Sequence, residues 1–573
     1  MVSSLTPTIY TPLYLFSFLL AYLVLARLYR LYTNYALARH QNLPIIVLPW
    51  SWQDPLWMLL APRFLWLRHL PWFSTWIPYS YMGWTTQDKG RIHRPPPLGL
   101  GPAFIVVSPS RTEFFTTDPQ TAVAVKRNWR EYEHPPDLYA VFDVFGPNLL
   151  SANGPDWQRH RKIVGGAFRE AVYPTVWRES WARMDELMEK LVRAGRMTLE
   201  EVRKESGILA MHVLGKAAFG SAHGHGEEGV ASNHTGHRLS YLECLEVMYP
   251  NLMGVILFGG LKTSVPDWIL PKPLKRVKTA VEEYRLYLLE AVQRQQKKGT
   301  QQGGAVADLA TLLVRANDAE KEEDPKSGHL TAAELYGNMF IFNIAGYETT
   351  AMSLSFAIPY LAAFPDVQAW ARDEVDEVFG KSDTLSYEEA YERLPRVRAV
   401  MYETLRLHSS VAHLPHESPS YPTTIEVPSL NRSIDIPPKS LVSIPVVISG
   451  YLPTEFNGPD PYLFAPSRFL TLDSTGAEVL LSDNELAKQG WIPWAVGPRV
   501  CPGKKFSQVE FVSAIAQLLL RAEVRVADQR GEGMERATAR VKEGLTDTEF
   551  NLGTTVRRTS DIGLEFVARA EVS

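Results

Sequence analysis

The segment Trp494-Ala495-Val496-Gly497-Pro498-Arg499-Val500-Cys501-Pro502-Gly503 decides the interpretation of this sequence, because it precedes an apolar helical run from Phe506 to Leu520. Cys501 lies at a turn that leads into a helix, where backbone N–H groups and the helix dipole favour the thiolate, the form that binds metal. Gly497 and Gly503 permit a tight turn and the approach of a flat ligand, and Arg499 offers a guanidinium fork for a carboxylate. This combination suits a haem held by one axial thiolate. A buried free cysteine is the alternative.

Composition limits the class of protein. The 573 residues are 45% hydrophobic, so a large core is possible, and the net charge of −4 predicts no nucleic-acid partner. The only two cysteines are Cys244 and Cys501, which excludes a disulfide framework and suits a reducing compartment. Cys244 lies in an amphipathic stretch and is interpreted as a core residue; a Cys244–Cys501 bridge is the alternative.

The N-terminus predicts a membrane anchor. Residues Leu5 to Ala26 carry no charge and are mostly apolar, and about 20 such residues span a bilayer core. Arg27, Arg30 and Arg39 follow this stretch, and no Lys or Arg precedes it, which places the rest of the chain on the cytoplasmic side. A cleaved signal peptide is the alternative, which the missing basic N-terminal region disfavours.

The chain is divided into an anchor (1–30), a membrane-proximal linker rich in Trp and Pro (31–97) and a catalytic domain (98–573). Seven of the fifteen tryptophans fall between Trp50 and Trp84. They form either a belt at the membrane interface or ordinary core packing, and the sequence leaves both open. Residues 93–97, His-Arg-Pro-Pro-Pro, are expected to be a stiff connector.

Helical periodicity dominates from Gln158 to about Val314, and short β-like runs occur elsewhere, so a mainly α fold with small β-sheets is expected. The histidine-rich segment His223–His237 is interpreted as a solvated loop rather than a metal site. The expected strands are Ala103–Val107, Thr424–Val427, Ile434–Ile436, Leu441–Val447, Glu523–Val526, Thr554–Arg557 and Leu564–Ala568.

A long helix is predicted from the capping box Thr331-Ala332-Ala333-Glu334 to Phe364, which Pro365 ends. Its middle contains Ala345-Gly346-Tyr347-Glu348-Thr349-Thr350. A glycine inside a helix needs a reason, and close approach of a flat ligand is one; a buried helix with a lone glycine is the alternative. The Glu348 carboxylate and the Thr349 hydroxyl share one turn, which the hydroxyl can open so that it relays protons.

Two further pairs of residues have a spacing that places both members on the same face of a helix. Glu403 and Arg406 are neighbours at i, i+3, and Arg468 is the expected third member of a buried charge network. An exposed surface pair is the alternative. Trp157 and Arg161, at i, i+4, present an indole N–H and a guanidinium on one helix face.

These motifs resemble those of the cytochrome P450 superfamily. The cysteine segment is similar to F-x-x-G-x-R-x-C-x-G, with Trp494 in place of the first Phe, and residues 345–349 match A-G-x-D/E-T. Residues 403–406 match E-x-x-R. The order and spacing agree from Gly154 to Phe506. The resemblance implies the cytochrome P450 fold, mainly α with small β-sheets.

The resemblance also implies site roles. Cys501 becomes the axial ligand of haem b iron, and Thr349 and Glu348 become the catalytic proton relay. His416 stands where the family often carries an arginine, and Ser409-Ser410 stand where it carries Pro-Pro. The remaining cofactor-binding residues are Trp157, Arg161, Arg499, Gly497, Gly346 and His416. The structural triad is Glu403, Arg406 and Arg468. The substrate contacts are Phe342, Ala345, Val411, Leu414 and Phe550.

The function implied is a haem-thiolate monooxygenase that inserts one oxygen atom of O2 into a lipophilic small molecule, a secondary metabolite such as a terpenoid or polyketide, or a lipid. The chain lacks a dinucleotide fingerprint or flavin domain, so its electrons are expected to come from another protein. The resemblance implies that they come from NADPH through NADPH-cytochrome P450 reductase, with cytochrome b5 as a second partner. The implied location is the endoplasmic reticulum membrane. A haem-thiolate isomerase or dehydratase, which needs no external electrons, and a non-catalytic haem sensor are the alternatives.

Overall fold

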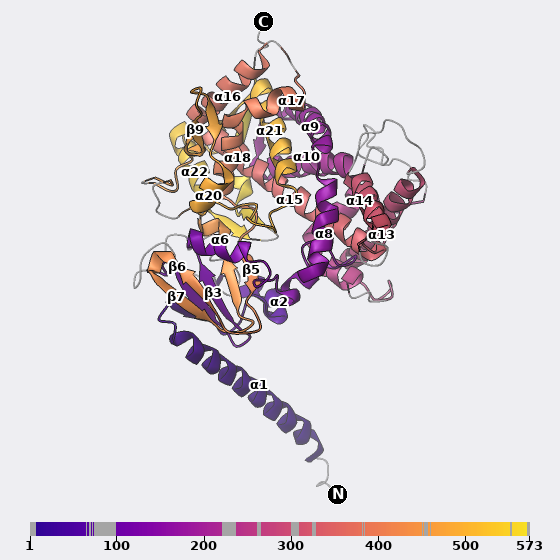
Figure 1. The fold of residues 1–573 in the computed structure, drawn as a ribbon, viewed down its shortest axis with the longest axis vertical. Coiled ribbons are helices and arrows are strands. Elements are labelled where there is room, and N and C mark those ends of the chain that lie inside the picture. The colour runs from indigo at the N-terminus through magenta and orange to yellow at the C-terminus, as the bar shows by residue number, and fades with distance from the viewer. Residues whose placement is uncertain are drawn as a thin grey trace.

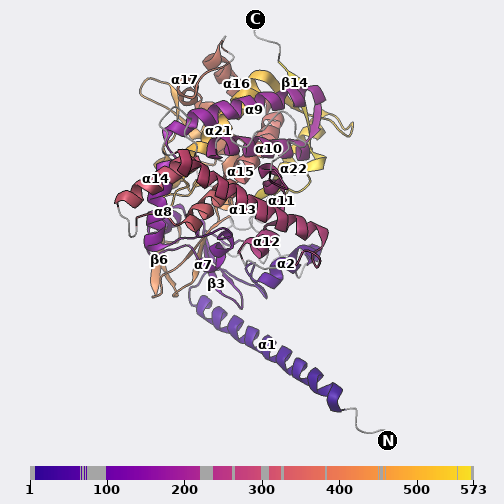
Figure 2. The same cartoon turned by 90° about the vertical axis from the view of Figure 1, so that its right-hand side faces the viewer.

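Helices make up most of the described chain, as the apolar periodicity of the sequence predicts (Figures 1 and 2). The computed structural model describes residues 7–64, 66–67, 70, 73, 99–219, 236–260, 265–298, 309–323, 328–380, 382, 384–449, 451, 456–458, 460–550 and 553–569. The predicted connector 93–97 and most of the histidine-rich segment lie outside these residues. The predicted fold class, mainly α with small β-sheets, is confirmed.

The helices of six or more residues are α1 (Pro7–Arg39), α2 (Pro55–Phe64), α6 (Pro119–Arg127), α8 (Gly154–Ala167), α9 (Tyr173–Ala194), α10 (Leu199–Phe219), α11 (Tyr241–Met248), α13 (Lys272–Lys298), α14 (Leu309–Glu323), α15 (Ala332–Ala363), α16 (Pro365–Phe379), α18 (Pro395–Leu407), α20 (Asp483–Lys488), α21 (Lys504–Arg521) and α22 (Met534–Thr546). The shorter ones are α7 (Pro136–Tyr139), α12 (Leu252–Val255), α17 (Tyr387–Ala390) and α19 (Val446–Ser449).

The strands are β1 (Ile45–Val47), β2 (Ala103–Val107), β3 (Thr112–Thr116), β4 (Arg196–Thr198), β5 (Leu414–Glu417), β6 (Thr423–Val427), β7 (Arg432–Ile436), β8 (Leu441–Ile444), β9 (Leu470–Leu472), β10 (Glu478–Leu480), β11 (Ala522–Val526), β12 (Thr548–Phe550), β13 (Thr554–Val556) and β14 (Gly563–Ala568). Every predicted strand is present, but the run expected to reach Val447 ends at Ile444. Pro445 has no N–H to donate to the sheet, and the helix α19 begins directly after it.

The described strands form one larger sheet and several small ones. The larger sheet has the order β1-β2-β3-β8-β5, in which β1 runs parallel to β2 and β3 runs parallel to β8. A three-stranded sheet has the order β11-β14-β4, and the pairs β6-β7, β9-β10 and β12-β13 complete the set. The larger sheet lies at the α1 end of the body (Figure 1).

The longest helix of the body, α15, begins as predicted. Thr331 Oγ1 accepts a hydrogen bond from the Glu334 N–H at 3.3 Å, and Glu334 Oε2 accepts one from the Thr331 N–H at 2.7 Å. The helix ends at Ala363, just before Phe364 and Pro365. The sequence therefore predicts both ends of this element, because the capping box and the proline act locally.

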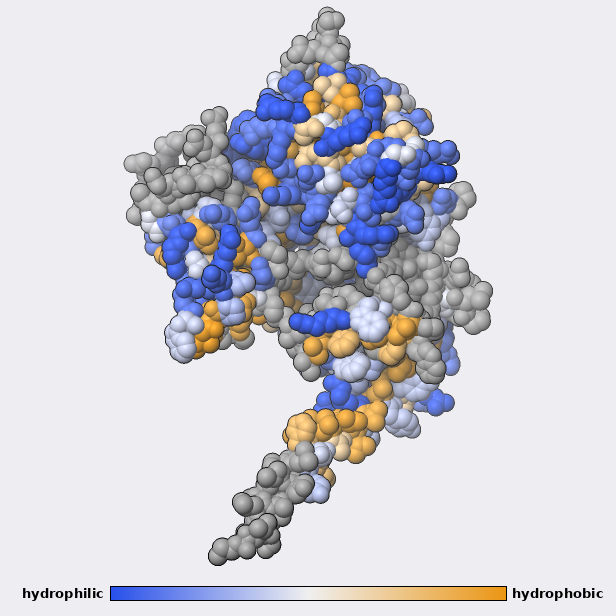
Figure 3. Space-filling model, turned by 180° about the vertical axis from the view of Figure 1, so that it is seen from behind, coloured by the Kyte–Doolittle hydropathy of each residue, from blue (hydrophilic) through white to orange (hydrophobic). Residues whose placement is uncertain are grey.

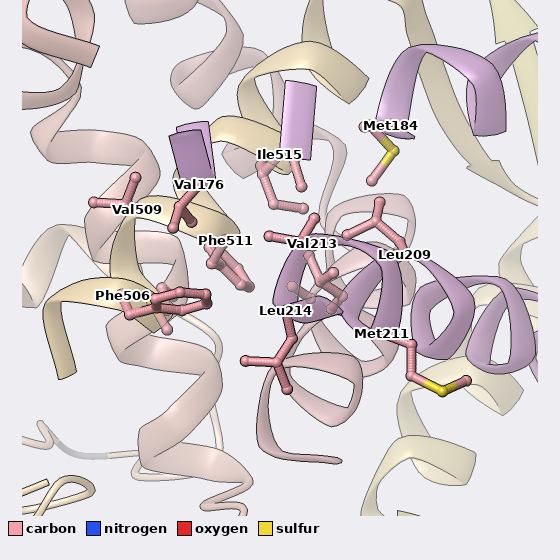
Figure 4. Packing of buried hydrophobic residues seen from close by; sticks show 14 of the residues in the cluster. Val176, Met184, Leu209, Met211, Val213, Leu214, Phe506, Val509, Phe511 and Ile515 are labelled. Atoms are coloured by element: carbon pink, nitrogen blue, oxygen red, sulfur yellow. The ribbon is translucent and has the colours of Figure 1, made fainter. Parts of the chain in front are cut away.

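The main core is built where α9, α10, α15 and α21 pack together. Figure 4 shows its side chains at close range. Val176 comes from α9, Val213 from α10, and Phe511 and Ile515 from α21, and all four are fully buried. This core packs against α21, which directly follows the cysteine segment, and against α15, which carries the Glu348–Thr349 turn.

The N-terminal helix α1 projects from the body (Figures 1 and 2). Tyr14–Arg39 is the one stretch of the described chain that is long and apolar enough to cross a membrane, and none of its most apolar window is buried. Figure 3 shows hydrophobic surface along the part of α1 nearest the body. The helix continues beyond residue 30 to Arg39, because strong helix formers follow and the left-handed Asn42 and Pro44 come only afterwards.

The region predicted as a linker, 31–97, contributes to the body. Its strand β1 pairs with β2 in the larger sheet. Trp52 Nε1 donates a hydrogen bond to Glu113 at 3.1 Å, and Trp57 is buried and stacks on Trp50. Trp66 is 60% exposed. The four described tryptophans thus divide between packing and surface, and Trp72, Trp76 and Trp84 lie outside the described residues.

Candidate active site

The cysteine loop is a tight turn in front of α21. The Cys501 N–H donates to the Trp494 carbonyl at 2.9 Å, and the turn places Ala495 and Gly497 at positive φ of 59° and 75°. The Cys501 side chain is exposed, although protein atoms surround it on many sides. The thiol therefore lies inside the body and is still accessible to a metal that has an open coordination position.

The surroundings of Cys501 shift the pKa of its thiol in opposite directions. Burial raises the pKa of the thiol, and the opposing effects of the Gly503 N–H, Arg161 and Lys504 are smaller. Removal from water penalises the thiolate more than nearby positive charge favours it. Metal binding must therefore displace the thiol proton.

Each of two glycines predicted to admit a flat ligand also lies close to a neighbouring segment of the protein. A Cβ on Gly497 would lie 3.0 Å from the Lys126 carbonyl oxygen, and a Cβ on Gly346 would lie 3.1 Å from Leu214 Cδ1. Gly497 thus lets the loop approach the end of α6, and Gly346 lets α15 approach α10. The glycine beside the sulfur is Gly503, whose Cβ would lie 3.9 Å from Cys501 Sγ.

Trp494, the departure from the family pattern, is accommodated by a local hydrogen bond. Its indole Nε1 donates to Ser507 Oγ at 3.1 Å. Its ring makes an edge contact with Tyr402, with centroids 5.7 Å apart. The larger ring is therefore held in place by α21 and α18, and its N–H is satisfied without the sulfur.

The centre of α15 is an accessible turn in a mostly buried helix. Ala345 is exposed, and Phe342, Gly346, Glu348 and Thr349 are half-buried, while most residues on either side are buried. The predicted opening of this turn is not observed, because Thr349 Oγ1 donates to the Ala345 carbonyl at 2.8 Å and the helix is continuous. Burial raises the pKa of Glu348, and the charge of Arg203 opposes this.

A chain of contacts links α15 to the cysteine loop. The rings of Phe342 and Phe168 make an edge contact with centroids 5.3 Å apart. A Cβ placed on Gly503 would lie 3.9 Å from Phe168 Cε1 and 3.9 Å from Cys501 Sγ, so Phe168 and the sulfur are neighbours across this glycine. The thiol and the accessible turn of α15 are therefore parts of one site.

Two segments that carry or adjoin predicted substrate residues meet at this turn. Ser410 Oγ donates to the Thr349 carbonyl at 3.2 Å, and Val411 next to it is 37% exposed. Thr554 Oγ1 donates to the Ser409 carbonyl at 2.9 Å, which brings the β12–β13 hairpin to the same place. Leu414, half-buried, begins β5. The backbone of Phe550 pairs with Thr554, but its side chain lies outside the described part of the structure.

The two residues predicted on α8 lie near the cysteine loop. The Trp157 ring is buried, and the Arg499 guanidinium carbon lies 4.7 Å from its centroid in a cation–π contact. Burial lowers the pKa of Arg161, and the charge of Cys501 opposes this. Arg161 and Cys501 thus act on each other electrostatically.

A buried basic cluster, defined as Lys126, His134, His416 and Arg499, lies beside these residues. Lys126 Nζ is 3.1 Å from His416 Nε2, and Arg499 Nη1 is 3.1 Å from His134 Nδ1. Asn153 Oδ1 accepts a hydrogen bond from Arg499 Nη2 at 2.8 Å. Burial lowers the pKa of Lys126 to about 7 and that of Arg499 to about 10, and it holds both histidine pKa values well below 6.5.

The cluster tests whether haem fits this chain. Four basic groups buried side by side are unfavourable unless an anion joins them, and Arg499 Nε has no hydrogen-bond partner among the described residues. The two carboxylates of a haem held at Cys501 would supply that anion, so the residues fit the group. Sequence reasoning found Arg499 and His416 but missed Lys126 and His134, which lie in no motif.

The predicted charge network forms in full. Arg406 donates to the two carboxylate oxygens of Glu403 at 2.6 and 2.8 Å, and Arg468 Nε donates to Glu403 Oε1 at 3.2 Å. The Glu403 and Arg406 side chains are fully buried. Arg406 also donates to the Pro461 carbonyl at 2.7 Å. The network ties α18 to the segment that precedes the cysteine loop.

Comparison with known proteins agrees with this site. The family described as "Cytochrome P450" matches residues 99–545. The chain is 28% identical to the phomenoic acid biosynthesis cluster cytochrome P450 monooxygenase of Leptosphaeria maculans, over 87% of this chain and 90% of that protein. It is 26% identical to a cytochrome P450 monooxygenase of Arthrobotrys oligospora, over 93% and 95%.

Plant and structural relatives are similar over shorter or more divergent stretches. The 11-oxo-beta-amyrin 30-oxidase of Glycyrrhiza uralensis is 26% identical, over 70% of this chain and 72% of that protein. The crystal structure of the cytochrome P450DA heme domain superposes with a TM-score of 0.60 at 18% identity, over 82% of this chain and 90% of that chain. The last comparison shows the fold alone. The chain belongs to the cytochrome P450 family and is a monooxygenase, an oxidoreductase.

Proposed function

We propose that this enzyme inserts one oxygen atom of O2 into a lipophilic small molecule, with haem b held by Cys501. The observation that carries the proposal is the accessible turn of α15, which the contact between Phe342 and Phe168 joins to the segment beside the Cys501 thiol. When bound, the haem supplies the activation of oxygen, and a thiolate ligand donates charge to its iron. Trp157, Arg161 and the basic cluster hold its carboxylates.

Glu348 and Thr349 are proposed to move protons. The raised pKa of the Glu348 carboxyl makes it a better proton carrier near neutral pH than an exposed glutamate. The Thr349 hydroxyl donates to the Ala345 carbonyl at rest, and its oxygen can at the same time accept a hydrogen bond from water, which can return a proton to the hydroxyl when it gives up its own. Rotation of this hydroxyl away from Ala345 would pass a proton into the site.

The substrate is proposed to be a polyketide, a terpenoid or another lipid. The residues on or next to the segments that meet at the turn are apolar, which favours an apolar ligand. They are Phe342, Ala345, Val411 and Leu414. Among the relatives, one is named for phomenoic acid biosynthesis and another is an oxidase of 11-oxo-beta-amyrin. These names support a secondary metabolite as the substrate here.

Electrons are proposed to come from NADPH through NADPH-cytochrome P450 reductase, with cytochrome b5 as a second donor. α1 is proposed to anchor the chain in the endoplasmic reticulum membrane with the catalytic body on the cytoplasmic side. The apolar stretch of α1, and the arginines that follow it, support this orientation.

Product analysis by mass spectrometry tests the proposal. The full-length protein, reductase and NADPH are incubated with candidate polyketides, terpenoids and fatty acids under isotopically labelled dioxygen. We expect one labelled oxygen atom per product and no product from the Cys501→Ser variant. Product formed without NADPH would support the isomerase or dehydratase alternative instead.

A further inference from the structure

Oxidisable aromatic side chains form a continuous path from the cysteine loop towards the surface. This aromatic chain is defined as Trp494, Trp491, Tyr402, Tyr391 and Tyr387. The Trp494 ring lies 5.6 Å from that of Trp491 and 5.7 Å from that of Tyr402, measured between centroids. The rings of Trp491 and Tyr402 lie 4.5 Å apart. Trp494 belongs to the loop itself, because its carbonyl accepts a hydrogen bond from the Cys501 N–H, so the aromatic chain begins beside the thiol.

One buried amide joins the two tyrosines in the middle of the aromatic chain. Gln508 Nε2 donates to the Tyr402 hydroxyl oxygen at 2.9 Å, and the Tyr391 hydroxyl donates to Gln508 Oε1 at 3.3 Å. All three side chains are buried. Tyr402 lies on α18, Gln508 on α21, and Tyr391 directly follows α17. The hydrogen bonds of the amide therefore connect two phenols that the sequence places on separate segments.

The aromatic chain meets solvent at Tyr387. Its ring lies 5.4 Å from that of Tyr391 between centroids, and the residue is half-buried. Its hydroxyl donates to Oε2 of the exposed Glu170 at 3.2 Å. A carboxylate in this position can take up the phenolic proton when the ring loses an electron. Tyr391, in contrast, donates to an amide, which does not take up protons near neutral pH. Tyr387 is therefore the tyrosine that can form a neutral radical.

The charges near the rings agree with this assignment. Lys505 Nζ lies 3.9 Å from the centroid of Tyr391 and 5.9 Å from that of Tyr387. A cation over a ring makes the removal of an electron harder, and this effect falls with distance. Lys505 also pairs with Glu392 at 3.0 Å, which offsets part of its charge. An electron vacancy therefore passes across Tyr391 and comes to rest on Tyr387.

We propose that the aromatic chain carries electrons from the surface to the haem site, and that Tyr387 is a second reaction site, where small water-soluble hydrogen-atom donors such as ascorbate are oxidised. The inference rests on the proposed haem site at Cys501. The route is used when no substrate takes up the activated oxygen atom, so that two oxidising equivalents remain inside the protein. It protects the buried site, because the damage-prone oxidation is moved to an exposed residue that a solute can repair.

The electrons and protons of this route balance. Two electrons and two protons convert the untransferred oxygen atom into water, and the protons arrive from solvent through Glu348 and Thr349. Each electron leaves Tyr387 along the aromatic chain, while the phenolic proton moves to Glu170 and a neutral tyrosyl radical forms. One donor molecule returns a hydrogen atom to the radical, and Glu170 releases its proton to solvent. Two donor molecules are therefore consumed for each oxygen atom.

Electron paramagnetic resonance tests the inference. The full-length, haem-loaded ferric protein is mixed with hydrogen peroxide in the absence of substrate and frozen, and the ferrous carbon monoxide spectrum of a parallel sample reports the thiolate ligand. Tyr387→Phe removes the exposed phenol, and Trp494→Phe places the residue of the family pattern, which resists oxidation, in the loop. Trp370→Phe is the matched control, because Trp370 is also a half-buried indole beside a cation, with Arg396 5.3 Å from its centroid, and lies outside the aromatic chain.

We expect a tyrosyl radical signal in wild type and in Trp370→Phe, a weaker signal in Trp494→Phe, and loss of the signal in Tyr387→Phe. Ascorbate should quench the signal and slow the bleaching of the haem in wild type, but it should not slow bleaching in Tyr387→Phe. Tyr387→Phe loses one hydrogen bond at the surface, so it remains testable if Trp494→Phe does not fold. A tyrosyl signal that persists in Tyr387→Phe, or none in a wild type with a normal thiolate-type band, would overturn the inference. A wild-type protein with no thiolate-type band would overturn the proposed function instead.

Discussion

Glu403 and Arg406 are joined by two hydrogen bonds, of 2.6 and 2.8 Å, between side chains that have no solvent exposure. Because water cannot replace either partner there, we expect Glu403→Ala to cost about 3–5 kcal/mol of unfolding free energy and to reduce haem content. Glu186→Ala breaks an exposed i, i+3 pair with Arg183 on α9 and should cost under about 1 kcal/mol. Thermal unfolding of the two variants makes the comparison. Equal losses would show that burial does not decide the strength of the pair.

The hydroxyl of Thr349 should govern how efficiently electrons are used. Thr349→Ala removes the group that can pass a proton into the site, so we expect less product for each NADPH consumed and more peroxide. Haem binding should be unchanged, because the hydroxyl makes its one hydrogen bond within the described structure to the Ala345 carbonyl. Thr349→Ser retains the hydroxyl and is expected to keep the wild-type ratio. The proton-relay role is rejected if the alanine variant couples as well as wild type.

Two glycines on α15 make a matched test of what each one faces. A Cβ on Gly337 would lie 2.2 Å from the Gly146 carbonyl oxygen, whereas one on Gly346 would meet the flexible end of Leu214. We expect Gly337→Ala to destabilise by about 1–3 kcal/mol or more, while Gly346→Ala should change stability by about 1 kcal/mol or less, since the alanine favours the helix. Haem content should be normal in Gly346→Ala. Loss of haem from that variant would place the cofactor against Gly346 after all.

Lys126, which is proposed to bind the haem carboxylates, should destabilise the haem-free protein. Its pKa falls from 10.5 to about 7 on folding, so the unfolded chain binds more protons between these values and stability rises with pH across that window. We expect Lys126→Met to raise the melting temperature of the haem-free protein at pH 7, and to raise it less as pH approaches 10.5. A variant that melts lower than wild type at every pH would show that the lysine is a packing residue.

The two ends of α1 should behave differently on truncation. Deleting 1–30 removes the apolar stretch but leaves Asn34, which donates to the Ser108 carbonyl at 2.9 Å, and the buried Ala38. We expect weaker membrane attachment, not full release, because the exposed Trp66 remains. Deleting 1–39 should in addition lower the melting temperature. Fractionation and thermal unfolding check the two effects, and equal melting temperatures would separate α1 entirely from the body.

The sequence predicts the parts of the site that lie close together along the chain. Glu403 and Arg406, or Glu348 and Thr349, need only helical spacing to be recognised. Lys126 could not be predicted, because its partner His416 lies 290 residues away and no local pattern connects them. The close approach of Gly346 to Leu214 could not be predicted for the same reason, because Leu214 belongs to another helix. The raised pKa of Cys501 likewise depends on the surrounding protein and not on its own loop.

The contacts made by the C-terminal half of α1 bear on how the body would be oriented at a membrane. Arg27 forms an ion pair at 3.0 Å with Asp54, which lies between β1 and α2. Asn34 donates a hydrogen bond to the backbone of Ser108, which directly follows β2. The helix is therefore joined to the body at two points. A flexible tether would set only the distance between an enzyme and a bilayer, leaving it free to tumble. With α1 in a bilayer, as proposed above, contacts of this kind would also set the angle between the body and the membrane, so that the same face of the enzyme would be turned towards the lipid.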